Sequence, residues 1–442
     1  MILASAVRHR KEGRGPPAGR ESARLPLSPG PGSAASLAAL RRFQETHLIS
    51  LSLPVVGAVV LALAAVVRHP TPAQAQVPRA PAPAAASAPV PRLDSAGLPA
   101  ATVARIDSAI TAFMARERIP GLSIAVATGN QVRWEQGYGF ADLENFVPAT
   151  AATVYRLASV SKPITAVAVM QLAERGSLDL DVPIQRYVPS FPAKRYPVTA
   201  RQLLSHLAGV RHYKGDEWES TRPYPNLTAG LAMFEDDSLE HAPGARMTYT
   251  THGYTLLGAA VEGAARMPYM DYLRAHVLAP AGISAMRDDD VAALIPHRAR
   301  AYARDSTGAL RNAGLANTSY KIPGGGLVST AADVARFAVA VQSGRIVRPA
   351  TFARMTTPAR TTDGKAIGYG LGWTIGQIPT APPGVVWHSG GQQGTSSMVY
   401  LLPNDGTVVA ILTNLEGLGA ALQASANDVA RIVREGAARQ AR

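Results

Sequence analysis

The chain has 442 residues, of which 47% are hydrophobic and 17% are charged, so it can form a large globular core. The formal net charge is +13, but nine Lys or Arg and three Glu fall within residues 1–75, and no basic run with interleaved aromatic residues follows. We therefore expect no nucleic-acid partner. The absence of cysteine excludes disulfides, thiolate catalysis and cysteine-ligated metal sites.

The N-terminal part of the sequence predicts export. Residues 1–47 are rich in Arg, Gly, Pro, Ser and Ala without periodicity, which predicts disorder. A basic flank, a largely apolar run over residues 48–67 and the small-residue pattern Ala73-Gln74-Ala75 follow, in the order of a secretory signal. The apolar run is also long enough to span a bilayer, so residues 48–75 are either a cleaved signal peptide or a membrane anchor.

Both interpretations place the rest of the chain outside the cytoplasm, so we expect a periplasmic or secreted protein. Membrane attachment through residues 48–67 is expected if the segment is retained. Residues 76–93 are rich in Pro and Ala, which predicts an extended linker. The folded domain is expected over residues 94–442.

Apolar residues recur at spacings of three and four over residues 100–118, which predicts a helix. Two strand-like runs, 122–127 and 132–138, follow it around the turn sequence Thr128-Gly-Asn-Gln131.

The C-terminal end repeats this pattern. Two strand-like runs, 398–402 and 407–412, flank a turn, and a helical pattern over residues 422–433 comes next. The sequence thus predicts an α/β (α+β) fold, in which an antiparallel sheet flanked by helices is built from both chain ends. The middle of the chain, residues 163–320, is expected to form an inserted, mainly helical lobe.

Ser159 and Lys162 form the first candidate reactive group, directly before an apolar stretch that begins at Ile164. Side chains three residues apart lie on one face of a helix, so the amine can take a proton from the hydroxyl. The positive end of the helix dipole is expected to lower the pKa of Lys162. The simpler alternative is a capping Ser beside an exposed Lys, although the chain has only six lysines.

Tyr249 and Tyr254 form the second group, before an apolar run that begins at Leu256. A phenol at such a junction can move protons if nearby cations lower its pKa from about 10. The alternative is a pair of half-buried aromatic residues that hydrogen-bond at a helix start.

The third group lies within residues 387–394, before the strand-like run at 398–402. Gly390 and Gly391 would let a substrate approach the backbone, and His388 supplies a side chain that titrates near neutral pH. A glycine turn with a surface histidine is the alternative.

In their order, the three groups resemble the serine beta-lactamase and D-alanyl-D-alanine peptidase superfamily, specifically its class C-like branch. That branch is marked by S-x-x-K, then Y-x-N, and then K-T-G or H-x-G. The resemblance covers roughly residues 95–435 and includes the further segments 198–210, 323–333 and 368–373. Segments 204–213, 249–254 and 319–321 look most like the mitochondrial serine beta-lactamase-like members of the branch.

The resemblance implies a beta-lactamase/transpeptidase-like fold and a serine hydrolase that needs no cofactor. Ser159 would be the acylated nucleophile, Lys162 the proton acceptor, and Tyr249 the residue that passes the proton to the leaving group. The backbone N–H groups of Ser159 and Gly391 would form the oxyanion hole. The edge of the sheet where the substrate lies would be lined by His388, Ser389 and Gly390.

Two positions depart from the commonest family pattern. Thr251 stands where Asn is usual, which removes an amide that could donate to a substrate carbonyl and hold the lysine. His388 stands where Lys is frequent, so a cation facing a substrate carboxylate would be present only in part at neutral pH. Both changes argue against efficient lactam hydrolysis but leave the acylating groups in place.

Histidines 206, 212 and 252 and the acidic run at 288–290 suggest a metal site, but no pair has ligand spacing on a predicted helix, so we expect no metal. The sequence predicts acyl transfer to water from a peptide, amide or ester, with a small-molecule or peptide substrate, and does not separate a peptidase from an esterase. The alternative, motivated by Thr251, is a non-catalytic penicillin-binding-like protein that serves in ligand binding or assembly.

Overall fold

The computed structural model describes residues 97–440. The regions assigned to disorder, to a signal or anchor, and to a linker lie outside the described residues. Within residues 97–440, no helix is long and apolar enough to cross a membrane. The candidate span at residues 48–67 is not part of that range.

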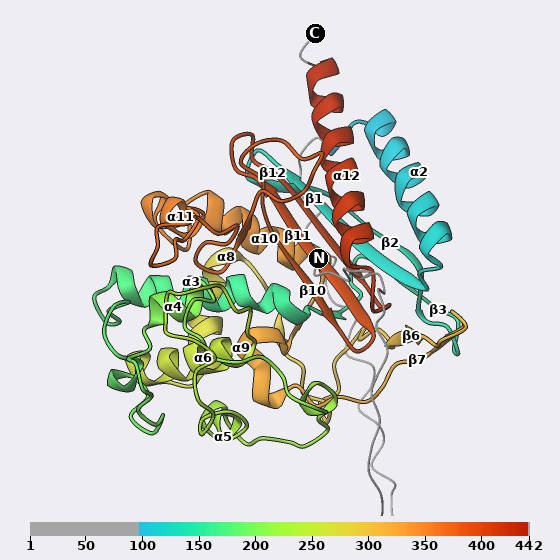
Figure 1. Cartoon of the computed structure of the whole chain (residues 1–442). Coiled ribbons are helices and arrows are strands. Elements are labelled where there is room, and N and C mark those ends of the chain that lie inside the picture. The colour runs from blue at the N-terminus through green and yellow to red at the C-terminus, as the bar shows by residue number, and fades with distance from the viewer. Residues whose placement is uncertain (1–96, 441–442) are drawn as a thin grey trace, which may run out of the picture. The chain divides into compact units, whose positions relative to one another are not determined.

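A seven-stranded antiparallel sheet brings together the two ends of the folded chain (Figure 1). Its strand order is β3-β2-β1-β12-β11-β10-β9. β1 (Gly121–Thr128) pairs with β12 (Thr407–Thr413), which confirms the predicted sheet built from both ends. The other strands are β2 (Gln131–Asp142), β3 (Val147–Pro148), β9 (Thr374–Ile375), β10 (Val386–Gln392) and β11 (Thr395–Leu402).

The turn between β1 and β2 has the backbone that its sequence requires. Gly129 has φ of +54° and Asn130 has φ of +63°. Positive φ at both central positions is typical of a type I′ turn, which matches the twist of the strands it joins. The predicted hairpin is therefore explained by local residue choice alone.

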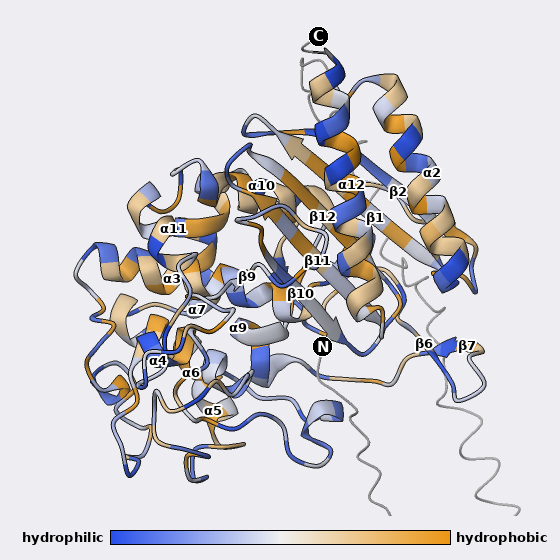
Figure 2. Cartoon of the chain, turned by 45° about the horizontal axis from the view of Figure 1, so that its top comes forward, coloured by the Kyte–Doolittle hydropathy of each residue, from blue (hydrophilic) through white to orange (hydrophobic). Residues whose placement is uncertain are grey.

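β1 is apolar on both faces because helices cover both sides of the sheet. Ile124 and Val126 pack with α2 (Ala100–Glu117) and α12 (Gly419–Gln440). Ala125 and Ala127 point to the opposite face, which α10 (Ala331–Gln342) covers. Figure 2 shows hydrophobic residues concentrated on the strands, and hydrophilic residues alternating with hydrophobic ones along α12.

The lobe beside the sheet is organised around α3 (Ser161–Glu174), whose residues 161–172 are all buried. A helix that is buried on all sides lies inside a core rather than on a surface. α3 contacts α6 (His252–Ala265) and α9 (Ile322–Gly325), and the short turn before it, η1 (Ala158–Val160), contacts β10. The start of α3 is thus held between the lobe and the edge region of the sheet.

The remaining elements are short. The helices and turns are η2 (Ile184–Arg186), α4 (Ala200–Leu204), η3 (Glu217–Glu219), α5 (Leu227–Leu231), α7 (Tyr269–Tyr272), η4 (Leu273–Leu278), α8 (Ala279–Ala281), η5 (Ser319–Lys321) and α11 (Pro349–Met355). The small sheets consist of β4 (Tyr155–Arg156), β5 (Arg287–Asp288) and β8 (Leu327–Ser329), and of β6 (Tyr302–Arg304) and β7 (Leu310–Asn312).

Candidate active site

Ser159 lies in the η1 turn directly before α3. The residue before it, Ala158, has φ of +46°, a conformation that is uncommon for a side chain with a Cβ. The helix cap at Val160 makes no side-chain hydrogen bond, and neither does the cap of η1 at Leu157. The capping interpretation of Ser159 is therefore wrong. Its half-buried hydroxyl is free to face Lys162.

Lys162 meets Ser159 through its side chain. Its Nζ lies 2.9 Å from Ser159 Oγ, 2.7 Å from the carbonyl oxygen of Gly324 and 3.2 Å from Thr251 Oγ1. Burial, and then the nearby charge of Lys321, hold the pKa of Lys162 well below its usual range. The direction agrees with the expectation from the sequence, and burial is its largest cause.

A neutral amine fits these three contacts. It has two N–H bonds and one lone pair. Gly324 O can only accept a hydrogen bond, and Thr251 Oγ1 can accept the second. The lone pair is then left for the hydroxyl proton of Ser159.

Tyr249 lies in the loop before α6 and completes the group. Its ring centroid is 4.8 Å from Lys162 Nζ. Burial raises the pKa of Tyr249, and a hydrogen bond with Ser159 acts in the opposite direction without cancelling that effect. The condition stated from the sequence, that nearby cations lower the pKa of this phenol, is therefore not met, because the effect of burial outweighs that of the hydrogen bond. Tyr249 is a neutral phenol at pH 7.

Two histidines position the loop that carries Tyr249 and Thr251. His206 packs its ring 4.3 Å from the ring of Tyr249, and its Nδ1 accepts a hydrogen bond from the backbone N–H of Thr250 at 3.2 Å. His212 Nδ1 accepts from the backbone N–H of Thr251 at 3.3 Å. From the sequence these histidines suggested a metal site, which their spacing argued against, and their part in holding this loop was not predicted. Among the described residues, no cluster of histidine and carboxylate side chains suited to a metal is present.

His388 is a neutral side chain, not a partial cation. It is 3% exposed, and burial lowers its pKa to about 3. Its Nδ1 lies 2.7 Å from the carbonyl oxygen of Ser389, and its Nε2 lies 2.9 Å from the hydroxyl of Tyr369. Nδ1 therefore donates to the carbonyl, and Nε2 accepts from the phenol. The expected cation facing a substrate carboxylate is absent at this position.

The two glycines of β10 have different surroundings. A Cβ on Gly390 would lie 2.3 Å from the carbonyl oxygen of Leu157, whereas a Cβ on the exposed Gly391 would meet nothing within 4 Å. β9 pairs only with Val386 and Trp387, so β10 continues beyond β9 through Gly391. The part of β10 next to Ser159 is thus packed closely on one side and open on the other.

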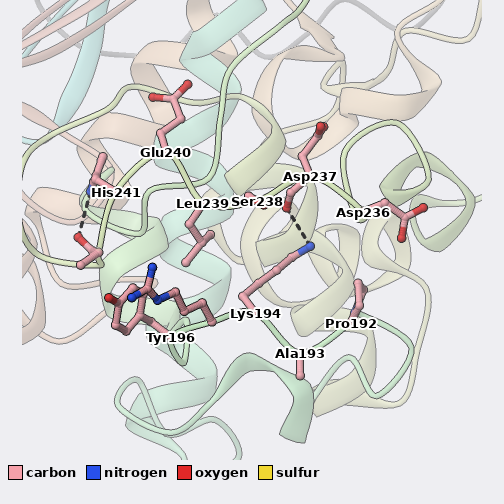
Figure 3. A pocket seen from close by; sticks show the side chains of 12 residues that line it. Pro192, Ala193, Lys194, Tyr196, Asp236, Asp237, Ser238, Leu239, Glu240 and His241 are labelled. Carbon is pink, nitrogen blue, oxygen red and sulfur yellow. Dashed lines mark hydrogen bonds between the residues drawn. The ribbon is translucent and has the colours of Figure 1, made fainter.

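A surface pocket of about 530 Å³ is lined by a different set of residues (Figure 3). It is formed by residues 192–196 and 236–242 and includes none of the predicted site residues. The lysine of the pocket, Lys194, donates to the backbone carbonyl of Asp237 at 2.9 Å. Its ammonium group therefore already has a hydrogen-bond acceptor within the protein.

The comparisons with known proteins concern the family and the fold. The beta-lactamase family pattern matches residues 106–433. The chain belongs to the beta-lactamase family. It is 28% identical to the mitochondrial serine beta-lactamase-like protein LACTB of Homo sapiens, over 68% of this chain and 74% of that protein.

Two further similarities support this membership. The chain is 29% identical to Penicillin-binding protein 4* of Bacillus subtilis (strain 168), over 66% of this chain and 68% of that protein. Among solved structures, the octameric penicillin-binding protein homologue from Pyrococcus abyssi has a TM-score of 0.60 and 26% identity, over 71% of this chain and 73% of that one. The predicted superfamily and the predicted fold class are both confirmed.

Proposed function

We propose that the protein is a serine hydrolase that forms an acyl-enzyme on Ser159 while it cleaves a peptide, amide or ester bond. The observation that carries this proposal is the buried Lys162 amine, 2.9 Å from Ser159 Oγ. A buried amine that is held neutral can act as a general base at neutral pH.

The proton transfers follow from the contacts of the three side chains. As Ser159 Oγ bonds to the substrate carbonyl carbon, its proton passes to the lone pair of Lys162. The neutral phenol of Tyr249 gives its proton to the departing group, and the Lys162 ammonium returns a proton to the phenol. In deacylation the transfers run in reverse with water in place of the departing group: Tyr249 passes its proton to Lys162 and takes one from the attacking water, and Lys162 gives its proton to Ser159 Oγ as the acyl bond breaks. The three side chains thus end in their starting states.

The backbone N–H groups of Ser159 and Gly391 are the proposed oxyanion hole. Gly391 is exposed, and the edge of β10 that contains it extends past β9. Donors fixed in a strand and in a tight turn need little reorganisation during the reaction, which is what oxyanion stabilisation requires. Along the same edge, His388, Ser389 and Gly390 would line the bound small-molecule or peptide substrate.

We also propose that the protein is exported, with residues 48–75 as a cleaved signal or a retained anchor. The basic flank, the apolar run and the Ala-x-Ala pattern support this assignment. N-terminal sequencing of the protein from fractionated cells tests it. A mature N-terminus shortly after Ala75 supports cleavage, and full-length protein in the cytoplasm refutes export.

An active-site serine probe tests the hydrolase proposal. Wild-type protein incubated with a fluorophosphonate should gain one adduct by intact mass, mapped to Ser159, and Ser159→Ala should gain none. Equal labelling of both proteins would refute the assignment. A panel of lactams, esters and short D-amino-acid peptides would then rank the substrates by turnover.

The neutral state of His388 and the presence of Thr251 favour one second candidate, a binding protein without turnover. In that case, ligands from the panel would raise the melting temperature through binding to the native state, while no substrate would be consumed. Turnover that depends on Ser159 would exclude this candidate.

A further inference from the structure

Lys321 is a second buried lysine beside the site. Its side chain is 1% exposed, and its Nζ lies 4.9 Å from the ring centroid of Trp218, 5.3 Å from that of Tyr320 and 5.4 Å from that of Tyr213. Within the described part of the chain, Nζ has no hydrogen-bond partner. Aromatic faces at this range attract a cation, so the three rings form a cage around the amine.

The charges around the cage leave Lys321 without a free counter-ion. Burial and the charge of Arg156 lower its pKa to about 7, and Asp289 partly opposes them. Asp289 is itself bound by Arg156 at 2.7 Å. The amine is therefore charged in mildly acidic solution, where it faces three aromatic rings and an aspartate that Arg156 already binds.

The cage is connected to both acceptors that hold Lys162. The backbone runs from Lys321 through two residues to Gly324, whose carbonyl oxygen accepts from Lys162 at 2.7 Å. Thr251, whose Oγ1 lies 3.2 Å from the same amine, is near enough to Tyr213 of the cage to oppose the rise in the pKa of that phenol. A change in the cage would therefore alter both contacts that orient Lys162.

The charge of Lys321 also acts on the side chains of the site. Lys321 lowers the pKa of Lys162 and of His212, because like charges in a poorly solvated site repel each other. The other titratable groups that face Lys162 are neutral histidines and tyrosines, namely His206, His212, His388, Tyr249 and Tyr254.

We propose that Lys321 and its aromatic cage are a positioning element for Lys162. The caged charge repels a proton from Lys162, and the cage and the adjoining segment fix the acceptors that turn its lone pair toward Ser159. The inference rests on the proposed acyl-enzyme function, because it assigns Lys321 a role in preparing the base for that reaction.

The pH dependence of Ser159 labelling by a fluorophosphonate tests the proposal. In Lys321→Met the repulsion is lost, so Lys162 takes up a proton more easily, and the acid limb of the labelling rate should move up by about one pH unit. Lys321→Arg keeps a cation and should restore the wild-type limb. Lys365→Met, which changes an exposed lysine, is the matched control and should behave as wild type.

The outcomes separate the two proposals. A wild-type protein that is not labelled at Ser159 at any pH refutes the hydrolase assignment itself. A labelled wild type whose pH profile is unchanged in a folded Lys321→Met variant refutes only the role of Lys321.

A measurement on the unmodified chain covers the case in which the methionine variant does not fold. Trp218 is in the cage, so its fluorescence should change as Lys321 loses its proton, with a midpoint near pH 7. Trp218→Phe should remove the transition. If wild type and Trp218→Phe give the same curve, the caged charge is refuted.

Discussion

Gly390 lies so close to Ser159 that a Cβ added to the glycine would come within 2.9 Å of the serine backbone nitrogen. β10 and the η1 turn therefore touch through their backbones at this point. The contact sets the separation between the serine and the next residue of the strand, Gly391. The geometry of the proposed oxyanion hole thus depends on the absence of one methyl group.

Gly390→Ala should move β10 away from the turn. We expect a loss of about 1–3 kcal/mol in the free energy of unfolding, as for overpacked sites. We also expect Ser159 labelling to slow, by a larger fraction of its rate than the fraction of the unfolding free energy that is lost. Denaturant unfolding and labelling kinetics measure the two effects. Gly314→Ala, where a Cβ meets nothing within 4 Å, should change neither.

Thr251→Val should leave one N–H bond of Lys162 without an acceptor. An unpaired buried donor costs about 1–3 kcal/mol, and the freed amine should orient less well toward Ser159, so both stability and labelling rate should fall. Thr251→Ser keeps the hydroxyl and should retain most of both. Equal labelling rates for the valine and serine variants would contradict the role assigned to this contact.

Tyr249→Phe should slow turnover by about a hundredfold or more, since it removes the group that protonates the leaving group. Its thermal stability should change little. Tyr254→Phe should show the reverse, because its buried phenol donates to the carbonyl of Leu204 at 2.8 Å, and the unpaired carbonyl destabilises the fold. Steady-state kinetics and thermal melts of both variants distinguish these patterns.

His388 should make stability depend on pH. Its pKa is about 3 in the folded protein and about 6.5 in an unfolded chain. Between these values the unfolded state binds more protons, so the stability contributed by the neutral histidine is complete above about pH 6.5 and is lost as the pH falls.

His388→Gln should therefore flatten the decline in unfolding free energy between about pH 6.5 and 4, by up to about 1.4 kcal/mol per pH unit. Urea unfolding at several pH values measures this slope. The exposed His297 gives the control His297→Asn, whose slope should match wild type. A slope in His388→Gln as steep as in wild type would show that His388 is not held neutral by folding.

Much of the fold could be predicted from local patterns. The turn at Gly129 and Asn130, the strand-like runs at both ends and the spacing of Ser159 and Lys162 each depend on residues that are neighbours in sequence. Lys321 was harder to recognise. The available signal was a scarce lysine directly after Tyr320, and its aromatic neighbours Tyr213 and Trp218 lie about a hundred residues earlier.

The sequence by itself determined the reactive residue types, the order of their motifs and the elements that hold them. Only the tertiary structure decided their protonation states. Burial raises the pKa of Tyr249 and lowers those of Lys162 and His388, and burial is the sum of contacts from α6, α9, β10 and the loops around them. No local pattern contains that sum, because each contributing segment comes from a distant part of the chain.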